Sequence, residues 1–149
     1  MKIAIGCDHA GYALKLELAE WLRGQGHELT DVGTHTAEAA DYPDFARAVA
    51  TEVTSGRAER GVIVCGSGVG ACIAANKVKG VRAGLCHDTF SARQGVEDDD
   101  MNTLCMGARI IGGSLAREVL GAFLGAKFSG LERHQRRLDK VLAIEAAGK

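Results

Sequence analysis

Short apolar runs alternate along this chain with longer amphipathic segments. Five short runs predict β-strands, at residues 2–6, 27–32, 61–65, 81–86 and 103–106. Apolar residues at helical spacing predict helices between and after these strands, over residues 12–23, 41–56, from the glycine-rich residues 66–70 to about 78, 89–96, 115–124 and 131–147. Strands that alternate with helices indicate a parallel sheet with helices on both faces.

The expected fold class is therefore α/β. It is a doubly wound, five-stranded parallel sheet of Rossmann-like or flavodoxin-like type, in which three layers form one domain over residues 1–149. Strands that are apolar throughout indicate burial on both faces. In such folds ligands bind outside the carboxyl ends of the strands. We therefore expect the chemistry in the segments after residues 6, 64, 86 and 106.

Composition removes several classes of function. The 149 residues carry 18 Lys and Arg against 19 Asp and Glu, so no global field attracts nucleic acid or an anionic membrane. No apolar run approaches the ~20 residues of a membrane helix, and the first residues are typical of a strand rather than of a signal peptide. A cytoplasmic protein is the simplest interpretation.

The cysteines also fit a reducing compartment such as the cytoplasm. They stand at positions 7, 65, 72, 86 and 105, an odd number without a CxxC pair. This spacing favours free thiols over a disulfide framework or a structural zinc site.

The richest stretch for chemistry is residues 62–71, in which an apolar run ends at Cys65 and a glycine-rich loop follows. A strand, a tight turn and a helix start would place the thiol beside a row of free backbone N–H groups. Such groups suit an anion or a developing oxyanion.

Several interpretations of this loop are open. A dinucleotide fingerprint fits loosely, with Ala71 in the third glycine place and Asp88 at the acidic position, but it normally belongs to the first strand–helix unit. A thiol phosphatase would need an arginine where Ala71 stands. Proton abstraction beside a carbonyl fits better, with Cys65 as base, the loop amides holding an enediolate and Ser67 bonding the sugar oxygens. A merely well-packed turn is the structural alternative.

Two other groups of residues have both structural and functional interpretations. Asp8 and His9 follow the first strand, where an acidic residue ordinarily caps a helix. Arg133 and Arg137 are four residues apart and share one helix face. They suit either a phosphate clamp or a solvated surface.

Together these pieces resemble one family, the type B sugar-phosphate isomerases, which contains ribose-5-phosphate isomerase B and the galactose-6-phosphate isomerase subunits. The resemblance spans almost the whole chain and rests on six motifs in order: Gly6-Cys7-Asp8-His9-Ala10-Gly11, Asp41-Tyr42-Pro43, Cys65-Gly66-Ser67-Gly68-Val69-Gly70, Ala74-Ala75-Asn76-Lys77, Gly107-Ala108-Arg109 and Arg133-His134-Gln135-x-Arg137.

The resemblance implies an aldose–ketose isomerase without metal or cofactor, active as a homodimer or dimer of dimers. Cys65 matches the base that moves a proton between C1 and C2, and Ser67 with the loop amides matches the enediolate site. The remaining matched positions line the sugar pocket or clamp the phosphate. They are Asp8, His9, Tyr42, Gly66, Gly68, Val69, Gly70, Asp99, Asn102, Arg109, Arg133 and Arg137. Of these, Arg133 and Arg137 would reach a neighbouring subunit from the C-terminal helix.

One position departs from the family pattern. Asp98 stands where a ring-opening histidine is expected, while Asn102 keeps its place. An aspartate with an ordinary pKa of ~3.9 is a poor acid at neutral pH, whereas imidazole can give and take a proton there. The substitution indicates a raised carboxyl pKa among adjacent carboxylates, a substrate that is already open-chain, or a weakened isomerase.

The leading hypothesis is an isomerase of ribose 5-phosphate and ribulose 5-phosphate, with Cys65, Ser67 and Asp98 as catalytic residues. The alternatives are an isomerase of galactose 6-phosphate or of an open-chain tetrose 4-phosphate, and a non-catalytic module that binds a sugar phosphate or a nucleotide.

Overall fold

The structure, a computed structural model, describes residues 1–148. These residues form five strands, β1 (Lys2–Cys7), β2 (Glu28–Asp31), β3 (Arg60–Cys65), β4 (Ala83–Leu85) and β5 (Thr103–Gly107). They also form a short 3₁₀ helix, His9–Gly11, and six α-helices: α1 (Tyr12–Gly24), α2 (Tyr42–Thr54), α3 (Val69–Ala75), α4 (Thr89–Asp99), α5 (Gly113–Gly125) and α6 (Glu132–Ala147). Every predicted strand and helix is confirmed, with boundaries moved by a few residues.

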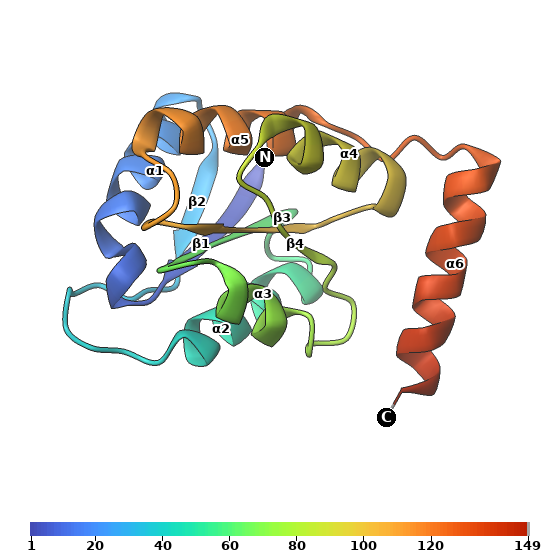
Figure 1. Ribbon diagram of the computed structural model, residues 1–149, viewed down its shortest axis with the longest axis horizontal. Helices are drawn as coiled ribbons and strands as arrows, with labels where there is room; N and C mark the ends of the chain where they lie inside the picture. Colours follow the sequence, from blue (N-terminus) through green and yellow to red (C-terminus); the bar gives the residue numbers. More distant parts are fainter. Residues whose placement is uncertain (149) are drawn as a thin grey trace.

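The strands form one parallel sheet in the order β2-β1-β3-β5-β4. Helices α1, α4 and α5 cover one face and α2 and α3 cover the other (Figure 1), which confirms the doubly wound, three-layer fold. The order exchanges the last two strands of the flavodoxin arrangement 2-1-3-4-5. The connection through α3 passes beyond the place of β5, and the connection through α4 returns to fill it.

The two faces of the sheet pack differently. The face under α1, α4 and α5 buries large side chains, among them Ile3, Leu18, Leu104 and Phe123. The face under α2 and α3 buries mostly small ones, including Ala4, Ala46, Ala50, Ala71 and Ala75. Small side chains let α2 and α3 approach the sheet closely, which fixes the start of α3 against the end of β3.

Two details differ from the sequence-based expectation. Strand β2 is not apolar throughout, because it is an edge strand whose Glu28 and Thr30 remain exposed. Helix α3 ends at Ala75 rather than near residue 78. There the Asn76 side chain accepts the Ala83 N–H and donates to the Ala83 carbonyl, both at 2.9 Å, and so ties the helix end to β4.

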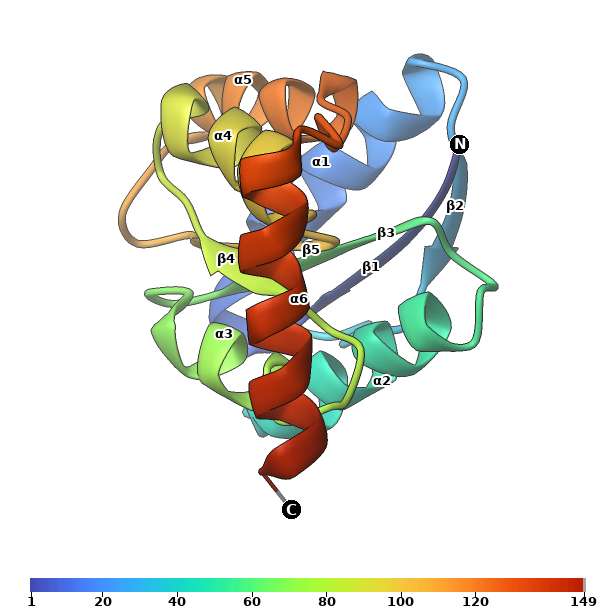
Figure 2. The ribbon, with the colours of Figure 1, turned by 90° about the vertical axis from the view of Figure 1, so that its right-hand side faces the viewer.

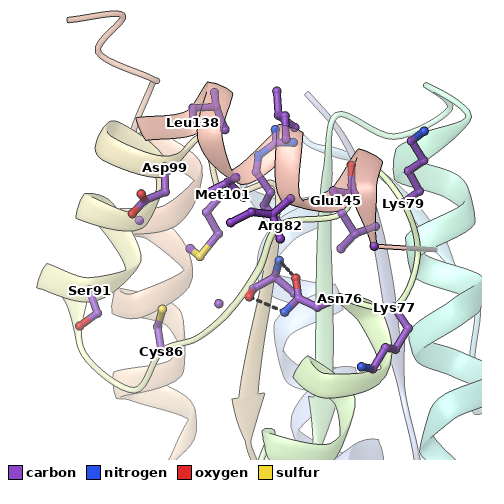
Figure 3. A pocket seen from close by; sticks show the side chains of 18 residues that line it. Asn76, Lys77, Lys79, Arg82, Cys86, Ser91, Asp99, Met101, Leu138 and Glu145 are labelled. Atoms are coloured by element: carbon purple, nitrogen blue, oxygen red, sulfur yellow. Dashed lines mark hydrogen bonds between the residues drawn. The ribbon is translucent and has the colours of Figure 1, made fainter. Parts of the chain in front are cut away.

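Helix α6 stands beside the sheet, next to β4 (Figures 1 and 2). Both of its ends are tied to the same chain: the Ser129 N–H donates to the Glu97 carbonyl at 3.0 Å, and the Gly80 N–H donates to Glu145 Oε1 at 2.8 Å. A cavity of about 800 Å³ lies between the helix and β4 (Figure 3). The residues of α6 near that cavity include the exposed Val141 and Ile144.

Candidate active site

Three neighbouring strands end together at the carboxyl edge of the sheet, on the side of the molecule away from α6 (Figure 1). Cys7 of β1 pairs with Val64 of β3, and Cys65 pairs with Gly107 of β5. The segments that follow these strands therefore meet, as the parallel topology predicts.

Cys65 closes β3 and lies beneath the glycine loop. Its Sγ accepts the Gly68 N–H at 3.1 Å, and the residue is only 4% exposed. Ser67 is exposed at the tip of the loop, where its Oγ accepts the Val69 N–H at 3.3 Å. Within residues 1–148 the amides of Gly66 and Ser67 have no hydrogen-bond acceptor. The thiol therefore lies beside two N–H donors that no group within residues 1–148 occupies, an arrangement suited to proton transfer and to an oxyanion.

Glycine is required inside this loop for two reasons. Gly68 has φ +82°, in the left-handed region that favours glycine. A Cβ at Gly68 would also lie 2.5 Å from Cδ1 of Leu85 and 2.9 Å from the carbonyl carbon of Met106. The loop therefore rests directly on the ends of β4 and β5, and this contact sets the position of its amides.

Arg109 brings a positive charge to the same edge. Its N–H donates to the Gly66 carbonyl at 3.0 Å, and the Ala108 N–H donates to the Cys65 carbonyl at 2.8 Å. The Arg109 side chain passes over the loop, with Cδ and Cζ each 3.6 Å from where a Cβ of Gly66 would be. An exposed guanidinium beside free amides suits a phosphorylated ligand.

Asp8 and His9 follow β1 and face the loop region from the other side. Asp8 is buried, and its Oδ1 accepts the Gly11 N–H at 3.1 Å, so the capping interpretation is confirmed. The exposed His9 lies with Nδ1 3.2 Å from the Ala40 amide nitrogen. His9 thereby links this edge to the segment that leads into α2.

Tyr42 completes this group. It is the first residue of α2, after Asp41, which occupies the N-cap position as predicted but makes no capping bond with its carboxylate. The Tyr42 ring lies against Gly70, where a Cβ would be 2.7 Å from Cζ. The structure thus brings together Cys65, residues 66–70, Arg109, Asp8, His9 and Tyr42.

The other predicted site residues lie elsewhere in the chain. Helix α4 starts near the carboxyl edge and returns to the amino edge, so Asp98 and Asp99 at its end are on the opposite side of the sheet from Cys65. Asp98 Oδ1 is 3.4 Å from His134 Nδ1, which is 2.6 Å from Ser129 Oγ. The same-chain pocket that would put Asp98 beside Cys65 is therefore not formed.

Asn102, Arg133 and Arg137 are also away from Cys65. The Asn102 side chain accepts the Arg82 N–H at 2.8 Å and donates to the Gly80 carbonyl at 2.9 Å, so its amide joins β5 to the segment before β4. Arg133 and Arg137 are exposed on α6, and Arg133 Nε donates to His134 Nε2 at 3.2 Å.

Two residues beside the site gave little signal in the sequence. His87 follows β4, and its Nε2 accepts the Gly107 N–H at 2.8 Å. Lys15 is fully buried in α1, where Nζ donates to both carboxylate oxygens of Asp31 at 2.9 and 2.7 Å and to the Thr34 carbonyl at 2.8 Å. For Lys15, the available signal in the sequence was the position of a lysine on the apolar face of the predicted helix 12–23.

The thiols differ in their proton affinity. Burial is the main cause that raises the pKa of Cys7 and of Cys86 to about 11 each. A hydrogen bond with Cys105 is the main cause that lowers the pKa of Cys72 to about 7. All five cysteines are free, as predicted.

Within residues 1–148 no group of three or more His, Cys, Asp or Glu side chains is arranged to hold a metal ion. None of the helices in that range has the length and hydropathy needed to cross a bilayer.

Comparison with known proteins assigns the chain to a class. A family model described as Ribose/Galactose Isomerase matches residues 3–141. The chain is 44% identical over 144 residues to ribose-5-phosphate isomerase B of Escherichia coli, which covers 97% of this chain and 96% of that protein. It is 42% identical over 131 residues to the D-erythrulose-4-phosphate isomerase of Pectobacterium atrosepticum, with 87% and 86% covered.

A solved structure gives the same result. Ribose-5-phosphate isomerase B of Clostridium thermocellum superposes with a TM-score of 0.97, at 46% identity and with all of both chains covered. Fold, loop and relatives together define the class, a sugar-phosphate isomerase that interconverts aldoses and ketoses. The chain belongs to the ribose/galactose isomerase family.

Proposed function

We propose that this isomerase interconverts ribose 5-phosphate and ribulose 5-phosphate, with Cys65 as the base that carries the proton. The observation that supports it most directly is the buried thiol beneath the glycine loop, beside the amides of Gly66 and Ser67, which have no acceptor in the described part of the chain.

The chemistry needs two proton movements. The Cys65 thiolate removes the proton from C2 of the open-chain aldose, and the electrons of that C–H bond form the C1–C2 double bond of a cis-enediolate. The same thiol returns the proton to C1, while the Ser67 hydroxyl relays a proton from O2 to O1. The amides of Gly66 and Ser67 stabilise the oxygen that carries the negative charge.

Binding would use the rest of the carboxyl edge. Asp8, His9 and Tyr42 border the sugar, and Gly68, Val69 and Gly70 shape the loop around it. The Arg109 guanidinium forms one arm of the phosphate clamp, because a planar fork of donors matches phosphate oxygens.

The second arm would come from another copy of the chain. We propose a homodimer or dimer of dimers in which α6 packs on the partner and brings Arg133 and Arg137, with Asp98, Asp99 and Asn102 nearby, to the neighbouring carboxyl edge. The exposed apolar side chains of α6, including Val141, Leu142 and Ile144, support this role, since a solvated helix has no need of them.

Residues 1–149 are proposed to act as one domain, since a single sheet carries both cores. A cytoplasmic location is part of the same proposal, because five free thiols suit a reducing compartment.

The test is the exchange of the substrate C2 proton with solvent, followed by NMR in deuterated water. Cys65→Ala should lower both exchange and turnover by about 10³-fold or more, because the base is lost. The matched control is Cys72→Ala, which removes a thiol from α3 and should leave both rates near those of the wild type.

Undiminished exchange in Cys65→Ala would refute the role of the thiol. A non-catalytic binding module would instead show thermal stabilisation by sugar phosphates without turnover of any open-chain sugar phosphate by the wild-type protein.

A second candidate substrate is an open-chain tetrose 4-phosphate. Its 4-hydroxyl is esterified, so it cannot close a five-membered ring and needs no ring-opening acid. The observation in its favour is Asp98, whose carboxylate lies 3.4 Å from His134 instead of presenting an imidazole of its own. The D-erythrulose-4-phosphate isomerase among the relatives is consistent with it.

The variant Asp98→His distinguishes between the two candidate substrates. If ring opening limits the pentose reaction, the variant should gain on ribose 5-phosphate and stay unchanged on the tetrose phosphate, since imidazole exchanges protons near neutral pH. Asp139→His, exposed on α6, is the control. No gain on the cyclising substrate would contradict the ring-opening explanation.

A further inference from the structure

The end of strand β5 is held by a side chain rather than by a neighbouring strand. The last β4–β5 ladder bond runs from the Cys86 N–H to the Cys105 carbonyl at 3.1 Å. Alternate residues of β5 face β4, so the next donor along the ladder is Gly107. Strand β4 has already ended at Leu85, and the Gly107 N–H donates instead to Nε2 of His87 at 2.8 Å.

Gly107 in turn supports the glycine loop, residues 66–70. A Cβ at Gly107 would lie 2.6 Å from both the carbonyl carbon and the oxygen of Ser67, so the two backbones are in direct contact. Gly107 is also paired with Cys65 in the β3–β5 register. A shift of Gly107 is therefore transmitted to Ser67 and Cys65, the two residues to which the proton movements are assigned.

The bond also defines the state of the imidazole. A ring nitrogen that accepts an N–H carries no proton, so this contact requires an imidazole that holds its proton on Nδ1. An imidazolium would present a donor to the Gly107 donor and break the contact. The neighbouring carboxylate, Asp88, is occupied in capping α4, where Oδ1 accepts the Ser91 N–H at 2.7 Å.

We propose that His87 is a positioning residue for the isomerase loop: its neutral imidazole extends the β4–β5 ladder by one bond and holds Gly107 against Ser67. The inference rests on the proposed function for its effect on turnover. The contact between His87 and Gly107 does not depend on the substrate, and it can be tested without one.

The decisive variants are His87→Leu and His87→Gln. Leucine removes the acceptor, whereas the glutamine Oε1 reaches the place of Nε2 and can accept the same N–H. His87→Leu should lower kcat by about 10- to 100-fold, because a small displacement of the reacting groups costs that much. KM should change by less than about 3-fold, since the loss falls on the transition state. His87→Gln should recover kcat to within about 3-fold of the wild type.

Hydrogen exchange of the Gly107 amide supplies the readout without substrate. Exchange should quicken about tenfold or more in His87→Leu and stay slow in His87→Gln, because an amide without an acceptor loses protection. Equal kcat or equal Gly107 exchange in the two variants would overturn the proposal. If the wild-type protein turned over no sugar phosphate, the proposed function would fail while the Gly107 exchange still decided the role of His87.

A measurement on the wild-type protein covers the case in which His87→Leu does not fold. Nitrogen-15 NMR of the imidazole at neutral pH should show Nδ1–H with unprotonated Nε2. A charged ring, or a proton on Nε2, would contradict the hydrogen bond and with it the proposal.

Discussion

The carboxyl edge and the amino edge of the sheet carry different functional groups. The carboxyl edge holds a buried thiol, Cys65, and the exposed Ser67, beside amides that have no acceptor within residues 1–148, which are groups suited to proton transfer and to an oxyanion. The amino edge holds charge: Asp98 against a buried imidazole, and Arg133 and Arg137 exposed on α6. The carboxyl edge thus carries the thiol, and the amino edge carries the guanidinium groups of Arg133 and Arg137.

The topology explains this separation. Each helix of a doubly wound sheet starts at the carboxyl edge and returns to the amino edge. The end of α4 and the start of α6 are consequently kept away from the loop that follows β3. In the proposed assembly, residues of both groups serve one phosphorylated substrate because two copies of the chain combine.

The largest effect is expected from mixing two inactive proteins. Chains with Cys65→Ala lack the base, and chains with Arg133→Ala and Arg137→Ala lack the clamp. In a two-fold dimer, a mixed pair has one site with both defects and one with neither, so random mixing should restore about a quarter of wild-type activity. Turnover after unfolding and refolding the mixture together is the measurement.

Each protein refolded alone is the control and should remain inactive. No recovery in the mixture, with mixed dimers confirmed by mass spectrometry of the intact complex, would show that both edges must serve the site from the same chain or that the clamp is elsewhere.

A smaller effect distinguishes the arginines of α6. Arg137→Ala should raise KM for a sugar phosphate by about 10- to 100-fold, because a charge-assisted contact to phosphate is removed. Arg136→Ala is the matched control: its side chain is 58% exposed and its partner is Glu132 at 3.9 Å on the same helix. Steady-state kinetics decides, and equal KM values in the two variants would remove α6 from the phosphate clamp.

Much of the carboxyl edge could be predicted from the sequence. Apolar runs identify strands because a sheet covered on both faces excludes polar residues, and a strand that ends at Cys65 before a glycine loop fixes the thiol at the edge. The small residues of α3 follow from the close approach of helix and sheet, and the Tyr42 contact with Gly70 joins α2 to α3.

The amino edge could not be predicted in this way. Periodicity gives elements but not their order, so the exchange of β4 and β5 is absent from the local pattern. Motif order places Asp98 in a family site without saying which copy of the chain contributes it. The Gly107 bond to His87 joins residues 20 positions apart through a side chain, and no spacing rule describes such a contact.

The thiols also differ in their expected reactivity toward alkylating reagents. The pKa of Cys72 is lowered to about 7, chiefly by its hydrogen bond with Cys105, so the reactive thiolate is lost as pH falls below that value. Alkylation of Cys72 by iodoacetamide should therefore slow about tenfold for each pH unit below 7 and level off above it.

Cys86 serves as the control, because burial raises its pKa to about 11 and keeps it protonated at pH 7 to 9. Peptide mass spectrometry gives the rate at each site. Equal rates for the two thiols at pH 7 would contradict the difference. Turnover that survives alkylation of Cys72 would leave the chemistry with Cys65.

The smallest expected effect tests whether the hydrogen bond from Gly80 to Glu145 holds the C-terminal end of α6, whose exposed face is proposed to pack on a partner. Glu145→Ala removes the acceptor of the Gly80 N–H at 2.8 Å and should lower stability by about 1 kcal/mol. For a chain of this size, that corresponds to a fall in Tm of about 2–4 °C. Glu132→Ala, whose side chain is 97% exposed, should leave Tm unchanged. If the two variants melt alike, the hydrogen bond from Gly80 to Glu145 does not hold the C-terminal half of α6.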